Sequence, residues 1–106
     1  MSVIYRKGAY YPGITQNKTT TSTSVVTSAF SSGTSIIRVA VQYDTYVRPV
    51  TSTGTTATIS SMIIPAGGIE FFAVDPSTYL ACLQVSTGGW ISVTELAETT
   101  AETAGS

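Results

Sequence analysis

The stretch Met62–Phe72, MIIPAGGIEFF, decides the fold class, because it places a proline and two glycines between two short apolar runs. Pro65 lacks an amide hydrogen, and Gly67 and Gly68 carry a high backbone entropy cost, so a helix is disfavoured here. The flanking isoleucines and phenylalanines suit a pleated sheet. The stretch therefore predicts a strand, a tight turn and a second strand, with PAGG closing a hairpin.

The composition extends this prediction to the whole chain. Of 106 residues, 19 are Thr and 14 are Ser, whereas only 10% are charged. Abundant β-branched Thr beside Val and Ile favours strands, and a helical bundle would need many more Leu, Glu and Lys. The length suits a single domain with one core. We predict an all-β domain.

Seven strand signals follow one another between residues 22 and 96, separated by turns rich in Gly, Pro, Ser and Thr. In one of them Ile37, Val39 and Val41 share a face, and Arg38 and Gln42 lie on the other. Such regular spacing predicts a small antiparallel β-sandwich or jelly roll of about seven strands. The predicted strands are Thr23–Phe30, Ile36–Gln42, Thr45–Val50, Ala57–Ile64, Ile69–Val74, Tyr79–Val85 and Trp90–Leu96.

Residues 1–21 show no sustained strand or helix period, so we predict an extended N-terminal arm ahead of the domain at 22–96. A frayed terminus is the simpler interpretation. Frayed tails are usually poor in aromatic residues, however, so we expect an arm that orders against a partner. We predict that residues 97–106 form a flexible acidic tail. The expected interface residues are Val3, Ile4, Tyr5, Arg6, Lys7, Tyr10 and Tyr11 of the arm, and Phe72 and Val74 of a predicted strand.

Several predicted strands are apolar on both faces. In Ile69–Val74 one face carries Ile69, Phe71 and Ala73, and the other carries Glu70, Phe72 and Val74. A free monomeric sandwich usually shows polar residues on its outer side, because water covers one face of each sheet. A second cover is therefore expected, either the other sheet wrapping around or a neighbouring subunit, and we predict a homo-oligomer.

Charge and cysteine content limit the partners and the compartment. The first 50 residues carry a net charge of +4 and the rest −5, which suits head-to-tail contacts between copies or an acidic partner. Five cations are too few for a nucleic-acid footprint. The single Cys82 and the absence of a signal-peptide pattern predict synthesis in a reducing cytoplasm. No apolar run reaches the length of a membrane helix.

The sequence offers no set of residues for catalysis. It contains no His, which removes the usual general base and the commonest metal ligand. Cys82 lies within a predicted strand, as a small buried apolar residue would, and one thiol without His makes no zinc site. We predict no catalytic, cofactor-binding or metal-binding residues, no small-molecule substrate, and no enzymatic activity.

The carboxylates and the tryptophan remain to be interpreted. Glu70 and Asp75 could approach across a turn, but their spacing puts them on opposite faces of one strand. Glu95 and Glu98 are expected to be solvated charges at a strand end. Trp90 either fills the core at the start of its strand or offers a sugar-stacking surface, and we favour the core.

Three segments in this order carry a resemblance: TSIIRVAVQYDTYVRP, SSMIIPAGGIEFFAVDPSTYLACLQVS and GGWISVTEL. Together they resemble a kind of small virion protein of tailed bacteriophages, including marine and cyanobacterial ones. The resemblance runs from about Ser35 to Leu96 and leaves the arm outside. It implies a structural part of the particle without catalytic residues.

On this resemblance we expect a capsid decoration, or cement, protein that binds the major capsid protein at the capsid surface of the virion. Gaps on the threefold axes of icosahedral shells favour a homotrimer. The alternatives are a head fibre base, or a head-to-tail or tail adaptor. A carbohydrate-binding module on a tail fibre is a further alternative, and it would need exposed aromatic residues on one sheet face.

Overall fold

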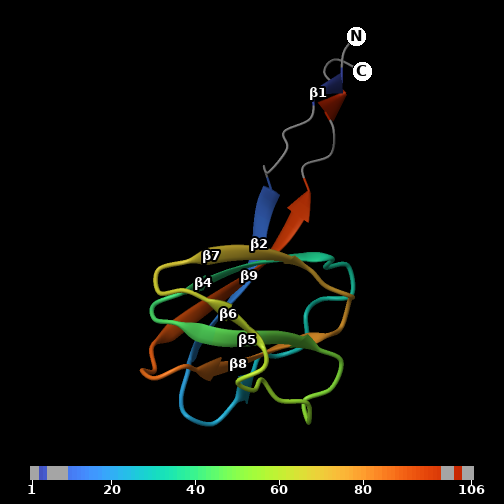
Figure 1. Ribbon diagram of the computed structural model, residues 1–106. Helices are drawn as coiled ribbons and strands as arrows, with labels where there is room; N and C mark the ends of the chain where they lie inside the picture. The colour runs from blue at the N-terminus through green and yellow to red at the C-terminus, as the bar shows by residue number, and fades with distance from the viewer. Residues whose placement is uncertain (1–2, 5–9, 99–101, 104–106) are drawn as a thin grey trace.

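The chain is all-β, as the sequence predicts (Figure 1). The computed structural model describes residues 3–4, 10–98 and 102–103, and these residues contain no helix. Eight of the strands form two four-stranded antiparallel sheets, and β1 and β10 form a separate pair. The strands are β1 (Val3–Ile4), β2 (Tyr10–Thr19), β3 (Val25–Val26), β4 (Ile36–Val41), β5 (Thr45–Val50), β6 (Met62–Ile64), β7 (Ile69–Ala73), β8 (Tyr79–Gln84), β9 (Trp90–Glu98) and β10 (Glu102–Thr103).

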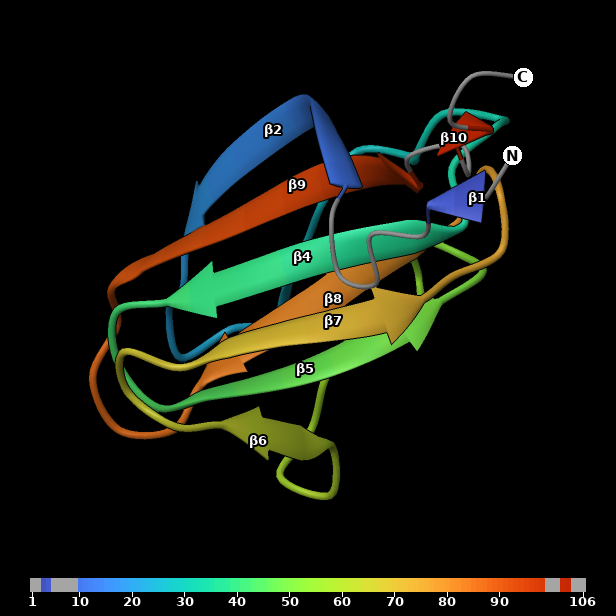
Figure 2. The same ribbon diagram turned by 90° about the horizontal axis from the view of Figure 1, so that it is seen from above.

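The first sheet has the strand order β2-β9-β4-β7 and the second has the order β3-β8-β5-β6. Figure 2 shows the two sheets from above, with β7 and β4 in one layer and β5 and β8 in the other. Between β2 and β9, only the β5–β6 connection stays within one sheet, and every other connection crosses to the opposite sheet. Neighbours in a sheet are therefore mostly distant in the sequence.

The core lies between the facing sides of the two sheets. On β4 the predicted alternation is confirmed, since Ile37, Val39 and Val41 are fully buried while Arg38 is half-buried and Gln42 is exposed. Strand alternation places every second side chain on one face, which explains how six residues supply three to the core. The core cluster comprises Phe30, Ile37, Val39, Val41, Val47, Ile64, Val74, Leu80, Cys82, Ile91 and Val93.

The second face of β8 is covered by the chain itself. Ala81 is fully buried in a small cluster with Val50 and Ala57 on the outer side of the second sheet. Ala57 belongs to the long β5–β6 loop, and its amide donates to Ser24 Oγ at 2.9 Å. A loop of the same chain thus supplies a second cover for this strand.

The PAGG segment turns the chain between sheets, so the predicted hairpin is wrong: β6 lies in the second sheet and β7 in the first. Gly67 has φ of +72°, and the Gly68 amide donates to the Pro65 carbonyl at 2.8 Å. A Cβ on Gly68 would lie 2.7 Å from that carbonyl oxygen. Asp44 Oδ1 accepts from the Ala66 amide at 2.8 Å and ties the turn to the β4–β5 loop.

Strand β2 lies within the stretch that the sequence assigns to an arm. From Thr15 to Thr19 it pairs with β9 as the edge strand of the first sheet, so the sheets contain eight strands where about seven are expected. Pro12 and Gly13 interrupt its alternation, and the register with β9 shifts between Pro12 and Thr15. Residues 97–98 belong to β9, and Glu102 of the expected tail pairs with Ile4 in the β1–β10 pair.

Candidate assembly surface

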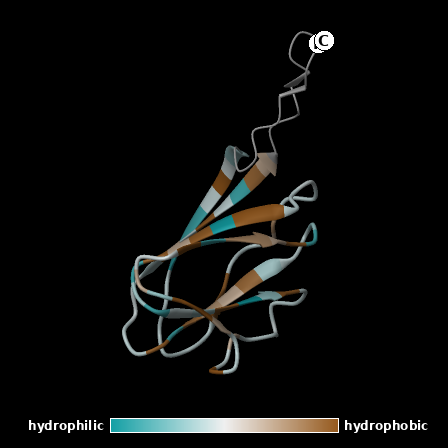
Figure 3. Cartoon of the chain, turned by 45° about the horizontal axis from the view of Figure 1, so that its top comes forward, coloured by the Kyte–Doolittle hydropathy of each residue, from teal (hydrophilic) through white to brown (hydrophobic). Residues whose placement is uncertain are grey.

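A two-stranded projection rises from the first sheet (Figure 1). It comprises residues 10–14 of β2 and residues 97–98 of β9, and it is called the ribbon below. Here Tyr10 pairs with Glu98 and Tyr11 with Ala97, beyond Leu96, the last residue of β9 that pairs with β4. The register shift between Pro12 and Thr15 lies at its base. Such bulges bend a strand and increase its twist, which accounts for the change of direction. Hydrophobic positions continue from the sheets into both strands of the ribbon (Figure 3).

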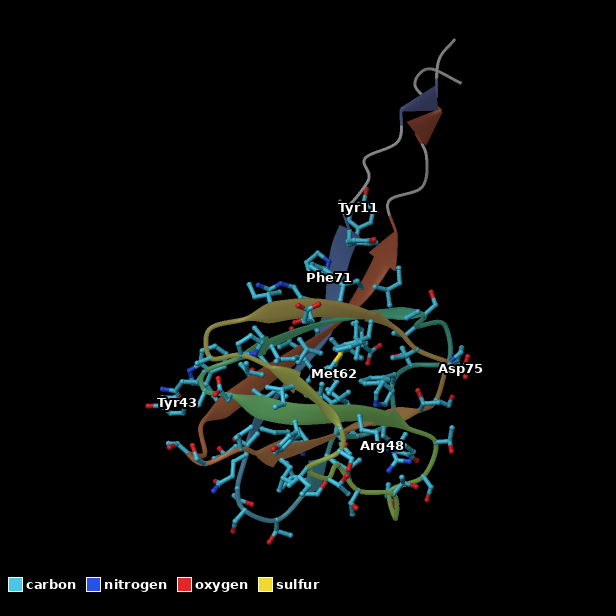
Figure 4. The ribbon with its side chains drawn as sticks, viewed as in Figure 1. Tyr11, Tyr43, Arg48, Met62, Phe71 and Asp75 are labelled. Carbon is cyan, nitrogen blue, oxygen red and sulfur yellow. The ribbon has the colours of Figure 1, made fainter. Side chains whose placement is uncertain are left out.

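The bend brings the ribbon over the outer side of β7. The rings of Tyr10 and Phe71 lie with their centroids 6.0 Å apart at an interplanar angle of 31°. Phe71 nevertheless remains 52% exposed, and its neighbour on the same side of β7, Ile69, is 46% exposed. Figure 4 shows Phe71 on the side of β7 that faces away from the core. These three residues, Tyr10, Ile69 and Phe71, are called the outer patch.

The ribbon itself carries further apolar residues in contact with solvent. Tyr11 is 62% exposed and Ile14 is 58% exposed. A two-stranded antiparallel ribbon is at best marginally stable in water when no third strand or other layer packs against it. The ribbon and the outer patch together therefore form an apolar surface that would be stabilised by a covering partner.

A second apolar site lies at the edge of the other sheet. Met62 and Ile63 on β6 are each 48% exposed, and Ile59 in the preceding loop is 79% exposed. Strand β6 is an edge strand of three residues, so one side of its backbone has no strand neighbour among the described residues. These residues, Ile59, Met62 and Ile63, are called the edge patch.

Four of the predicted interface residues lie in two separate strands. Val3 and Ile4 form β1, and Tyr10 and Tyr11 begin β2 in the ribbon. Tyr5, Arg6 and Lys7 lie outside the described residues. Phe72 packs half-buried against the core and Val74 is buried within it, on the opposite face of β7 from the outer patch.

The predicted interface residues do not include Ile14, Ile59, Met62 or Ile63, although these belong to the most exposed apolar residues. Ile69 and Phe71 could have been found from the alternation along Ile69–Val74, because Phe72 and Val74 on the other face already satisfy the core. The exposure of Met62 and Ile63 could not have been found from the sequence, because it depends on β6 lying at a sheet edge.

The structure corrects the expectation for Glu95, which is buried and not solvated. Its Oε1 accepts from Thr34 Oγ1 at 2.5 Å and from the Ser31 amide at 3.3 Å. The side chain thereby ties β9 to the β3–β4 loop and satisfies the buried Thr34 hydroxyl. Glu70 is exposed on β7, and Asp75 is exposed in the turn that follows. The side chain of Glu98 lies outside the described set.

Cys82 is a core residue with no solvent exposure. Burial raises the pKa of its thiol from 9.0 to about 11, and the positive charge of Lys18 opposes this only in part. The neutral thiol contacts the Val25 carbonyl at 3.6 Å. A thiol that stays protonated is a poor nucleophile, so the geometry gives Cys82 a packing role.

Trp90 does not fill the core, contrary to the favoured interpretation, since it is 48% exposed. Its amide donates to Gln42 Oε1 at 3.1 Å. The neighbouring Gly89 allows the ring of Tyr43, itself 41% exposed, to lie close to the backbone, where a Cβ would be 2.6 Å from Tyr43 Cδ2. Two exposed aromatic residues thus lie at the end of the sandwich where β4 and β9 meet the loops.

No group of three or more His, Cys, Asp or Glu side chains able to hold a metal ion occurs within residues 3–4, 10–98 and 102–103. The same part of the chain has no helix with the length and apolar character needed to cross a membrane. Comparison with protein families, curated proteins and solved structures finds no match for this chain.

Proposed function

We propose that the chain is a structural component of a bacteriophage particle, a capsid decoration protein that binds the major capsid protein at the capsid surface. The observation that carries this proposal is the uncovered apolar surface of the ribbon and outer patch, where Tyr11, Phe71 and Ile69 are about half exposed or more. Exposed apolar patches of this kind mark interaction sites. Residues 35–96 resemble small phage virion proteins, and this resemblance favours the surface of a phage particle as the binding partner.

The proposal includes a jelly-roll fold. In a jelly roll, eight antiparallel strands form two four-stranded sheets through two Greek keys, and viral capsid domains commonly use it. The orders β2-β9-β4-β7 and β3-β8-β5-β6 support this assignment, because successive strands alternate between sheets except at β5 and β6. Closure of both sheets around one core leaves the outer faces and the edges for assembly.

The proposal also includes that the chain forms a homotrimer, which would sit on the threefold axes of the capsid. Two separate apolar sites support it, since the outer patch lies on the first sheet and the edge patch on β6 of the second. One site suits contact with another copy, and the other suits contact with the shell. Stable oligomers commonly bury roughly 2,000 Å² or more in total.

The experiment that tests this function is the copy number of the chain in purified particles, measured by quantitative mass spectrometry against the major capsid protein. Decoration of the shell requires hundreds of copies. About a dozen copies would instead assign the chain to a head fibre base, a head-to-tail connector or a tail adaptor. Its absence from the particle would contradict a virion role.

A carbohydrate-binding role on a tail fibre is the second candidate, favoured by the exposure of Trp90 and Tyr43. Aromatic faces that meet solvent can stack on sugar rings. Trp90 is the only tryptophan of the chain, so its fluorescence reports directly on such contacts. A saturable change with soluble host polysaccharide, lost in Tyr43→Ala and kept in Tyr11→Ala, would favour this candidate over decoration.

A further inference from the structure

A groove on the second sheet, away from the outer patch, carries a cation and several hydroxyl groups. It has a volume of about 550 Å³ and lies between β5 and the end of the β5–β6 loop. Arg48, Thr58, Ser60, Ser61 and Met62 line it. Figure 4 shows Arg48 beside this loop, on the sheet opposite the one that bears Phe71.

The Arg48 guanidinium makes one hydrogen bond to the loop. Its Nη1 donates to the Thr56 carbonyl at 3.2 Å, which fixes the guanidinium against the loop. The remaining guanidinium N–H groups donate to no acceptor within the described part of the chain. No acidic residue lines the groove. The positive charge therefore faces solvent without a neutralising partner in the groove.

The hydroxyl groups of the loop are oriented by its backbone. Thr58 Oγ1 accepts from the Ser60 amide at 3.2 Å, and Ser61 Oγ accepts from the Thr58 amide at 3.0 Å. Each hydroxyl hydrogen thus remains available for donation, because a hydroxyl both accepts and donates. The groove combines a guanidinium fork with hydroxyl donors, which is a set of groups that suits an anionic oxygen ligand.

The same hydrogen bonds distinguish a carboxylate from a phosphate. Phosphate sites commonly use free backbone N–H groups or several cations. Here the amides of Thr58 and Ser60 already donate hydrogen bonds to side-chain hydroxyls of the loop. The Ser61 amide donates to the Thr58 carbonyl at 2.9 Å. A single planar guanidinium matches a carboxylate, which it can bind with two parallel hydrogen bonds.

We propose that the groove around Arg48 binds a carboxylate side chain of a neighbouring protein subunit. This inference rests on the proposed assembly function, because that function supplies the neighbouring subunit. One exposed ion pair contributes little to affinity. Many copies on one particle would multiply such weak contacts through effective concentration. The groove and the outer patch would then engage different neighbours.

The test is a titration of the purified full chain, followed by ¹H–¹⁵N NMR, with the tripeptide Ac-Gly-Glu-Gly-NH₂. We expect saturable shifts of the Arg48 Nε–H and of the Ser60 and Ser61 amides, with a Kd on the order of 100 mM. Ac-Gly-Gln-Gly-NH₂ should give none. Arg48→Gln should weaken the binding by up to about fivefold, while Arg38→Gln on the other sheet should leave it unchanged. About 0.5 M salt should weaken it.

Three results would overturn the proposal: no saturable shift with the Glu tripeptide, equal shifts with the Gln tripeptide, or tighter binding of inorganic phosphate at the same residues. Unchanged backbone resonances away from the groove would show that Arg48→Gln folds normally. Because the probe is small and no shell is present, failure here leaves the copy-number and oligomer tests of the proposed function unaffected.

Discussion

Replacing Glu95 by Ala should destabilise the domain, although a glutamate near a strand end would ordinarily tolerate this change. Two hydrogen bonds to its carboxylate, from Thr34 Oγ1 and the Ser31 amide, would be lost. Thr34 is 6% exposed, so its hydroxyl would be left without a partner, at a cost of roughly 1–3 kcal/mol. Ser31 is exposed, and its amide can turn to water.

The lost packing adds to this cost. Removal of the buried methylene of Glu95 costs about 0.8 kcal/mol, so the total loss of unfolding free energy is about 2–4 kcal/mol. For a domain of this size each kcal/mol lowers the Tm by roughly 4–8 °C, so a fall of about 8–30 °C is expected. Urea unfolding followed by circular dichroism measures the free energy, and a thermal scan gives the Tm.

Two variants control the reasoning. Glu95→Gln keeps an oxygen acceptor at the same distance from Thr34 and should lose less than half as much stability as Glu95→Ala. Glu70→Ala removes an exposed glutamate and should stay within about 0.5 kcal/mol of the unchanged chain. The reasoning is refuted if Glu95→Ala also stays within about 0.5 kcal/mol, or if Glu95→Gln is equally damaging.

Three further predictions concern the turn glycines, the thiol and the outer patch. Gly88→Ala should lower the unfolding free energy by about 2 kcal/mol or more in the same urea assay, because its Cβ would overlap the Thr20 carbonyl; a neutral effect would contradict the close approach of the two backbones. Between pH 9 and about 11 the stability should fall, since the unfolded thiol of Cys82 loses its proton at lower pH than the buried one, and the fall should be smaller in Cys82→Ala. Phe71→Ser should reduce oligomer formation, measured by sedimentation at micromolar concentration, without changing the β-type circular dichroism. Equal oligomerisation of the variant and the unchanged chain would show that the outer patch does not form the contact between copies.

Local sequence patterns predicted five of the strands closely. β5 begins and ends where it was predicted, and β4, β7, β8 and β9 agree within two residues at each end. β2 was missed because Pro12 and Gly13 break its alternation, and because an edge strand on the surface needs few apolar residues. The predicted strands Thr23–Phe30 and Ala57–Ile64 shrink to β3 and β6, since most of their residues run along loops.

The pairing of strands could not be predicted from local patterns. PAGG fits a hairpin by turn chemistry alone, but the partner of β7 is β4 and that of β6 is β5. Tyr10 pairs with Glu98, almost a whole chain length away. The burial of Glu95 likewise depends on Thr34, which reaches it from a loop distant in sequence. The candidate assembly surface arises from the same long-range pairing, because the bent β2 brings Tyr10 to Phe71.

The most direct test of the assembly role adds the purified chain to capsid shells that lack it and measures co-sedimentation. The account predicts saturable binding at a fixed ratio to the major capsid protein. Deletion of residues 1–13, which removes the first four residues of β2, should abolish this binding while the domain still folds. The account is contradicted if the full chain does not co-sediment with these shells at any concentration up to the micromolar range.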